Sequence, residues 1–149
     1  MHLLDTEANT AFRIFTAEGA ENLARNCVSQ DTLDLSGNYA EWISLFSFID
    51  DFDRAWLQQP FELHHLGPIF TLPEWKLAKR KPSSRASHAI TVCLRKGIGS
   101  RVELFDHKSF DLEPGEAVIY DVWNKHRIVG SKTQDSLYLT ATCYIRTEE

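Results

Sequence analysis

Three histidines of this 149-residue chain are placed so that different strands could bring them to one point. Read with the two-residue period of a β-strand, His65 and His88 fall on the apolar sides of their strands, and Glu62 and His64 fall outside. His126 follows an apolar strand across a short loop. Neutral imidazoles that converge in this way suit Fe, Zn, Ni or Cu. The trio predicts a divalent transition-metal site, with hydrogen-bonded core histidines as the structural alternative.

Two polar residues end the strand that precedes His126. They are Tyr120 and Asp121, and Trp123 follows them. A phenol and a carboxylate beside a bound substrate can assist proton transfer, so Tyr120 and Asp121 are the candidate catalytic residues. Trp123 is a candidate wall of a ligand pocket, and His126 is a candidate ligand-binding residue as well as a metal ligand. The alternatives are a loop cap for Asp121 and ordinary packing for Trp123.

A basic segment, WKLAKRKPSSR at residues 75–85, stands out in a chain whose net charge is −5. Residues 1–62 carry 11 acids and 3 bases, whereas residues 63–149 carry 10 acids and 13 bases. The basic segment could grip phosphate or another anionic ligand, and we name Arg85 as its candidate ligand-binding residue. A solvated loop is the alternative. One basic loop on an acidic chain argues against a nucleic-acid partner.

The length and the 43% hydrophobic content fit one domain over residues 1–149 with a real core. The apolar runs are too short to cross a bilayer, and the first residues lack a signal-peptide pattern. The three cysteines form no C-x-x-C pair, which suits small core residues in a reducing compartment. We therefore expect a cytoplasmic protein with no membrane partner. The sequence also holds no G-x-S-x-G elbow and no phosphate-binding glycine loop.

The elements that must position these residues are mostly strands. Residues 18–28 have the apolar spacing of a helix, and residues 39–49 read as a strand, within an N-terminal part that ends near residue 60. From residue 61 onward, turn segments separate short apolar runs, and no amphipathic helix of usable length occurs. We predict a mainly β fold, a small antiparallel barrel or jelly roll over residues 61–149, with one N-terminal helix packed outside.

The same period-two reading predicts the faces of the last strand. Its apolar side is expected to point inward, namely Leu137, Leu139, Ala141, Cys143 and Ile145. Its other side is expected to face solvent or a partner, namely Tyr138, Thr140, Thr142 and Tyr144. Exposed tyrosines on a flat sheet could pair with a second copy, so we expect a homodimer, with a solvated strand face as the alternative.

Residues 86–130 resemble the cupin, or double-stranded β-helix, superfamily. The matching run leads from a proline-glycine turn to a histidine eleven positions after the glycine, through Leu112, Pro114, Gly115, Glu116 and His126. The same stretch is similar to the aspartyl/asparaginyl β-hydroxylase branch of the iron and 2-oxoglutarate oxygenases, through Gly115-Glu116, Tyr120-Asp121 and His126. The resemblance implies a cupin-like barrel with His126 at its mouth.

The motifs that would complete a metal site in either family are largely missing. A cupin carries H-x-H-x(3,4)-E before the hairpin glycine, and with Gly99 as that glycine only His88 remains. An oxygenase carries H-x-[DE], and the nearest match, His65-Leu66-Gly67, has glycine in place of the carboxylate. Residues 133–135 replace the basic residue that would bind 2-oxoglutarate. A metal would need the atypical set of His65, His88 and His126.

Two functions are consistent with these observations. The first is a small cupin-like barrel that binds a small polar or anionic molecule, or serves as an oligomeric interaction module, without catalysis. The second is a metal-dependent dioxygenase or isomerase that uses Fe, Zn or Ni on the three histidines. The missing ligand positions favour the binding module.

Overall fold

The computed structural model describes residues 10–26, 32–33, 57–68, 72–78, 87–105 and 109–143. Its strands are β1 (Ala11–Arg13), β2 (Thr32–Leu33), β3 (Leu57–Leu66), β4 (His88–Arg95), β5 (Arg101–Leu104), β6 (Ser109–Phe110), β7 (Glu116–Asp121), β8 (His126–Val129) and β9 (Ser136–Cys143). The described part of the chain has one helix, α1 (Ala17–Asn26). No helix among these residues is long and apolar enough to cross a membrane. The predicted cytoplasmic location stays a prediction.

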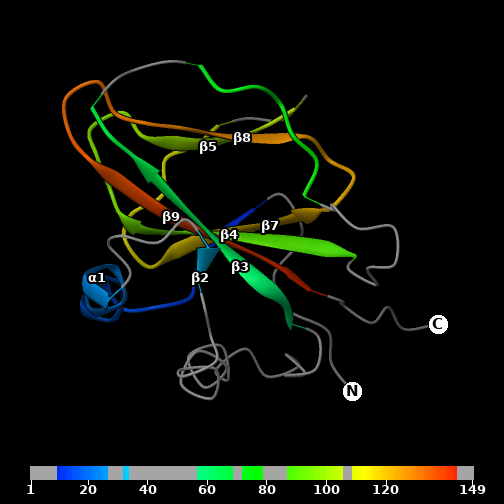
Figure 1. The fold of residues 1–149 in the computed structure, drawn as a ribbon, viewed down its shortest axis with the longest axis horizontal. Helices are drawn as coiled ribbons and strands as arrows, with labels where there is room; N and C mark the ends of the chain where they lie inside the picture. The colour runs from blue at the N-terminus through cyan, green and yellow to red at the C-terminus, as the bar shows by residue number, and fades with distance from the viewer. Residues whose placement is uncertain are drawn as a thin grey trace.

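The strands form two antiparallel sheets (Figure 1). One sheet has six strands in the order β1-β7-β4-β9-β3-β2, and the other has three in the order β6-β5-β8. In Figure 1, β5 and β8 lie in a layer above β4 and β7, and α1 lies below. Strands far apart in the chain, such as β1 and β7 or β3 and β9, are thus neighbours in one sheet, as in a jelly roll. The predicted mainly β fold with a helix packed outside is confirmed.

The main core lies between the two sheets. Its members from or beside the six-stranded sheet are Ala89, Cys93, Val118, Tyr120, Val122 and Tyr138, and those from the other layer are Val102, Leu104, Phe110, Leu112 and Ile128. Burial of this apolar surface is the main favourable term in the folding of such a domain. Cys93 has the core position predicted for it, and burial raises the pKa of its thiol to about 12.

The opposite face of the six-stranded sheet is buried as well. Its side chains alternate with those of the main core, so they point to the side on which α1 packs against β4. They include Ile90, Val92 and Leu94 on β4, Leu137, Leu139 and Ala141 on β9, and the helix contributes Ala20, Leu23 and Ala24. Both faces of β4 and β9 are therefore covered.

The period-two reading of β9 chose the wrong side as inward. Its apolar set faces the α1 side, whereas Tyr138 and Thr140 are only 0% and 7% exposed and point between the sheets. When both faces of a strand are covered, an apolar stripe does not show which face lines the interior. Tyr138 and Thr140 therefore cannot form the predicted dimer surface. Tyr144 lies outside the described residues, and the homodimer stays a prediction.

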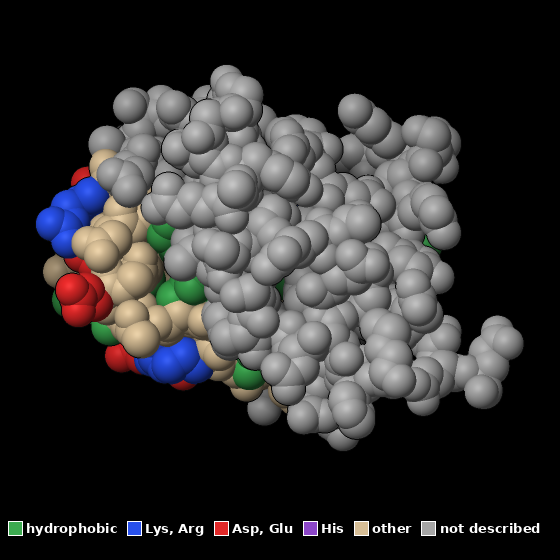
Figure 2. Space-filling model, turned by 90° about the horizontal axis from the view of Figure 1, so that it is seen from below, with side chains coloured by type: hydrophobic (Ala, Val, Ile, Leu, Met, Phe, Trp, Pro, Cys, Tyr) green, Lys and Arg blue, Asp and Glu red, His purple; other side chains and the backbone are tan. Residues whose placement is uncertain are grey.

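Charges of both signs lie on the described part of the face that carries α1. Figure 2, which shows the molecule from below, has basic and acidic side chains beside one another on this face. On and next to α1, Arg25 and Arg95 each lie 3.9 Å from a carboxylate oxygen of Glu21. Exposed pairs of this kind contribute little to stability, at most about 1 kcal/mol each. The described part of this face therefore has no patch of a single sign.

Candidate functional site

A row of polar side chains crosses the inner face of the six-stranded sheet. Tyr120 on β7 has its hydroxyl 2.8 Å from Thr91 Oγ1 on β4, and Thr91 Oγ1 lies 2.9 Å from Thr140 Oγ1 on β9. His64 on β3 continues the row, with Nε2 3.1 Å from Thr140 Oγ1 and 3.8 Å from Glu62 Oε2. The four strands are successive neighbours in the sheet. We call Glu62, His64, Thr91, Tyr120 and Thr140 the polar row.

Strand register explains why these residues meet. Thr140 is the cross-strand partner of Thr91 on one side and of Glu62 on the other. Residues directly opposite on antiparallel strands share a face, with Cβ atoms about 4.5–5.5 Å apart. Tyr120 is paired with Ala89, two residues before Thr91, and its long side chain spans the offset. A shift of one residue in any strand would move its member to the α1 side.

The polar row runs from a buried end to an end that solvent can reach. Tyr120 and Thr91 are 0% exposed, whereas the side chains of His64 and Glu62 are 26% and 25% exposed. Burial raises the pKa of Tyr120 well above its ordinary value; the hydrogen bond with Thr91 opposes this effect and the charge of Glu62 adds to it. Tyr120 is therefore a neutral phenol at physiological pH and can serve as a hydrogen-bond donor.

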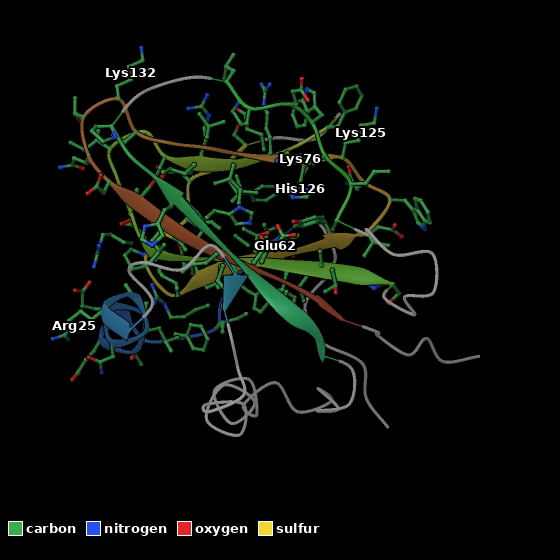
Figure 3. All side chains as sticks on the ribbon, viewed as in Figure 1. Arg25, Glu62, Lys76, Lys125, His126 and Lys132 are labelled. Atoms are coloured by element: carbon green, nitrogen blue, oxygen red, sulfur yellow. The ribbon has the colours of Figure 1, made fainter. Side chains whose placement is uncertain are left out.

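His126 faces the polar row from the other sheet. It is the first residue of β8, is 7% exposed, and its ring centroid lies 4.9 Å from that of Tyr120. Its backbone N–H and C=O pair with those of Lys76, both N···O distances being 2.9 Å. Figure 3 shows His126 and Lys76 on one side of the space between the sheets and Glu62 on the other. The polar row and His126 therefore border the same space.

Of the predicted site residues, Tyr120 and His126 come together, and the other histidines do not join them. His65 is exposed, and its cross-strand partner Leu137 belongs to the α1 side. His88 and Asp121 are partners on that same outer face, so the sheet separates them from His126. The inward orientations predicted for His65 and His88 are wrong, because the strands are covered on both faces. The inward histidine of β3 is His64.

Asp121 caps a turn, which is the role that the sequence analysis gave as the alternative to catalysis. Its Oδ1 accepts a hydrogen bond from the backbone N–H of Trp123 at 2.7 Å, and its C=O accepts one from Asn124 at 2.9 Å. This is the pattern of an aspartate-initiated turn. Trp123 is 63% exposed and does not wall the space between the sheets. Arg85 lies outside the described residues, so its ligand-binding role stays a prediction.

Sequence reasoning missed most of the polar row. The sequence reading placed Glu62 and His64 outside, Thr140 on a solvent face, and Thr91 on the face of its strand opposite His88. The usable signal was the position of Thr91 and Thr140 within strands whose other residues are mostly apolar. A buried hydroxyl is retained where a partner satisfies it. Small polar residues on one face of an apolar strand therefore mark the face that lines the interior.

The described residues of this site do not form the set of ligands that the sequence suggested for a divalent metal. Among the residues that the structure describes, no three His, Cys, Asp or Glu side chains come together as a metal site. The residue beside His126 is Lys76, and its ammonium cannot ligate a cation. Residues 77–86, which follow it, contain no His, Cys, Asp or Glu. The described residues therefore give no support for Fe, Zn or Ni on His65, His88 and His126.

Comparison with known proteins supports the fold. No family model and no curated protein matches the chain. Among solved structures, the chain is similar to a prolyl-4-hydroxylase from Pseudomonas putida, with a TM-score of 0.58 and 20% sequence identity over 92% of this chain and 88% of that one. At this identity the likeness shows the fold alone. The chain therefore has the cupin-like, double-stranded β-helix architecture that its sequence resembles.

Proposed function

We propose that this protein is a binding module that holds a small polar molecule between its two sheets, in contact with the polar row and His126. The observation that carries the proposal is the polar row itself. Its members interact from Glu62 through His64, Thr140 and Thr91 to Tyr120 along the inner face of the larger sheet. The proposal includes no metal-dependent step.

Burial of the polar row between the sheets costs free energy of folding. An unpaired buried hydroxyl costs roughly 1–3 kcal/mol in mutational data, and a hydrogen bond returns only about 1 kcal/mol net. Valine at positions 91 and 140 and phenylalanine at position 120 would fill almost the same volume without this cost. Four neighbouring strands nevertheless carry polar groups on the inner face, opposite a histidine. Such convergent polar groups are typical of ligand sites.

The chemistry of the polar row defines the kind of ligand. The hydroxyls of Thr91, Tyr120 and Thr140 can each donate or accept a hydrogen bond, and the carboxylate of Glu62 accepts. A ligand with hydroxyl, amine or amide groups can bond to the donors and acceptors that remain on these groups, whereas an apolar ligand can make no hydrogen bond with them. Glu62 and His64 are partly exposed, so they form the end at which a ligand would enter.

A hydroxylase is the alternative that the structural neighbour raises. The neighbour is a prolyl-4-hydroxylase by name, and the sequence resembles the iron and 2-oxoglutarate oxygenases through Gly115, Tyr120 and His126. That activity would require a metal, and the described residues around His126 do not offer a set of ligands for one. We therefore favour binding over metal-dependent catalysis.

The test is a ligand screen by NMR on the full chain, using polyols, amino acids and small carboxylates as probes. We expect probes to shift signals of the polar row and of His126, and Thr140→Val to weaken the best probe by about fivefold or more, since it removes a buried hydrogen-bonding group. Thr140→Ser keeps the hydroxyl and should bind as the wild type does. Thr133→Val, in an exposed loop, is the matched control.

Two results would count against the proposal. The first is a screen in which no probe shifts these signals. The second is a Thr140→Val variant that remains folded by circular dichroism and binds as well as Thr133→Val. If Thr140→Val does not fold, Thr91→Ser and Thr91→Val provide the same comparison one strand away, because Thr91 bonds both Tyr120 and Thr140.

A further inference from the structure

The orientation of Lys76 is fixed by its pairing with His126. The two backbones exchange hydrogen bonds as an antiparallel bridge, and directly paired residues of antiparallel strands place their side chains on the same face. The neighbours on each strand confirm this direction. Trp75 and Arg127 lie on the opposite face, where the guanidinium carbon of Arg127 sits 4.1 Å from the centre of the Trp75 ring. Lys76 therefore starts from the same face as the buried His126 ring.

Lys76 differs from the other cations of this layer in its partners. Arg101 and Arg127 each pair with Glu103 at 2.7 Å, and Lys96, next to β4, pairs with Asp111 and Glu113 at 2.9 and 2.6 Å. The ammonium of Lys125 lies over the Phe105 ring. No carboxylate among the described residues pairs with Lys76, whose side chain is exposed. Lys76 thus lies beside His126, and its exposed side chain starts from the face that carries the His126 ring (Figure 3).

We propose that the ligand of this site carries one carboxylate, which Lys76 binds at the rim while the rest of the molecule bonds to the polar row. This inference rests on the proposed function and adds the chemical class of the ligand. An ammonium offers three donors to a carboxylate, and the pairing is stronger at a partly desolvated rim than in open water.

The charge of Glu62 limits how much negative charge the ligand carries. Glu62 lies on the opposite side of the same space, and its charge acts on Tyr120. A phosphate dianion would meet this carboxylate with only one lysine to offset it, whereas phosphate sites usually present arginines or several backbone N–H groups. A single carboxylate carries less negative charge for Glu62 to repel, and one ammonium can offset it. A hydroxyl or amine elsewhere on the ligand can then donate to Glu62 or to the threonines.

The experiment compares charged probes with their uncharged amides on the full chain by NMR titration. The probes are glycolate and lactate, each paired with glycolamide and lactamide, and inorganic phosphate is added as a separate probe. We expect each carboxylate to bind about threefold to tenfold more tightly than its amide and more tightly than phosphate. Lys76→Met should abolish this preference, and Lys76→Arg should keep most of it.

The matched control is Lys125→Met. Lys125 is also exposed and lies one residue before His126, but its ammonium sits over the Phe105 ring on the outer side, 5.8 Å from the ring centre. This variant should keep the preference of the wild type. Both variants change exposed side chains, and their folding is checked by thermal unfolding.

The outcomes separate the two proposals. If the amides bind the polar row as tightly as the carboxylates, and Lys76→Met changes nothing, the carboxylate inference is overturned and the binding module stands. A preference for phosphate would overturn the inference in the same way. If neither carboxylates nor amides shift the signals of the polar row, the inference fails together with its basis in the proposed function. Loss of the preference in Lys125→Met would also overturn the role of Lys76.

Discussion

The imidazole of His88 lies on the outer face of the larger sheet rather than in the site. Its Nδ1 is 2.8 Å from Ser87 Oγ, and Asp121 is its cross-strand partner. Burial lowers the pKa of His88 below its ordinary value of 6.5, although the carboxylate of Asp121 partly opposes this. The unfolded chain therefore binds a proton at this residue more readily than the native chain. Its contribution to stability is complete above pH 6.5 and is lost as the pH falls below that value.

The lowered pKa of His88 predicts how stability depends on pH at this one residue. The free energy of unfolding of the wild type should fall between about pH 7 and about pH 5 more steeply than that of His88→Gln, because the variant has no imidazole to protonate. Urea denaturation at several pH values measures the two slopes. Equal slopes would show that burial of His88 does not couple its protonation to folding.

At the scale of the element, the turn before β7 is the feature that the sequence predicted best. Pro114-Gly115 was predicted as a turn leading to a strand and then to His126, and Gly115 has φ of +94° in a turn where Glu116 N–H bonds Glu113 C=O at 2.8 Å. The Gly115 carbonyl also accepts hydrogen bonds from the backbone of Phe15 at 3.0 Å. The turn therefore joins the N-terminal segment to the sheet.

Alanine at the two glycines with positive φ should separate backbone strain from crowding. Gly115→Ala and Gly99→Ala each put a side chain in the left-handed region, at a cost of about 1–2 kcal/mol. A Cβ at Gly115 would also collide with the carbonyl oxygen of Phe15, whereas a Cβ at Gly99 would meet no atom within 4 Å. Gly115→Ala should therefore be less stable than Gly99→Ala by at least about 1 kcal/mol in urea denaturation. Equal losses of stability in the two variants would mean that Phe15 moves away from the added Cβ at little cost.

The faces of the strands were the part of the fold that the sequence did not predict. In β9 the apolar residues Leu137 and Leu139 pack on the α1 side, and Tyr138 and Thr140 line the interior. Alternation identifies the buried face only when the other face is in water. For the same reason, the sequence reading placed His65 inward in place of His64 and did not identify the polar row. His126 was placed well because its position follows from the turn and strand before it.

At the scale of the whole molecule, the double-stranded β-helix brings His126 of the smaller sheet, with Lys76 bridged to it, opposite four strands of the larger sheet. That topology explains how residues more than sixty positions apart in the chain, such as Glu62 and His126, border one space. Fold alone does not set the chemistry, since one fold carries many functions. The chemistry depends on which side chains these strands and the segment beside them present, and here they present hydroxyls, imidazoles, the carboxylate of Glu62 and the ammonium of Lys76.

The response of the folded protein to metal ions tests this conclusion as a whole. A ligand that binds only the native state at one hundred times its Kd adds about 2.7 kcal/mol of stability, which raises Tm by roughly 5–10 °C in a chain of this size. Because the described residues hold no set of three metal-ligating side chains, we expect Fe(II), Ni(II) and Zn(II) to shift Tm by less than about 1 °C. EDTA treatment of the purified protein should change Tm equally little. A saturable rise in Tm with one metal equivalent, absent in His126→Ala, would instead establish a metal site at His126 and favour the oxygenase alternative.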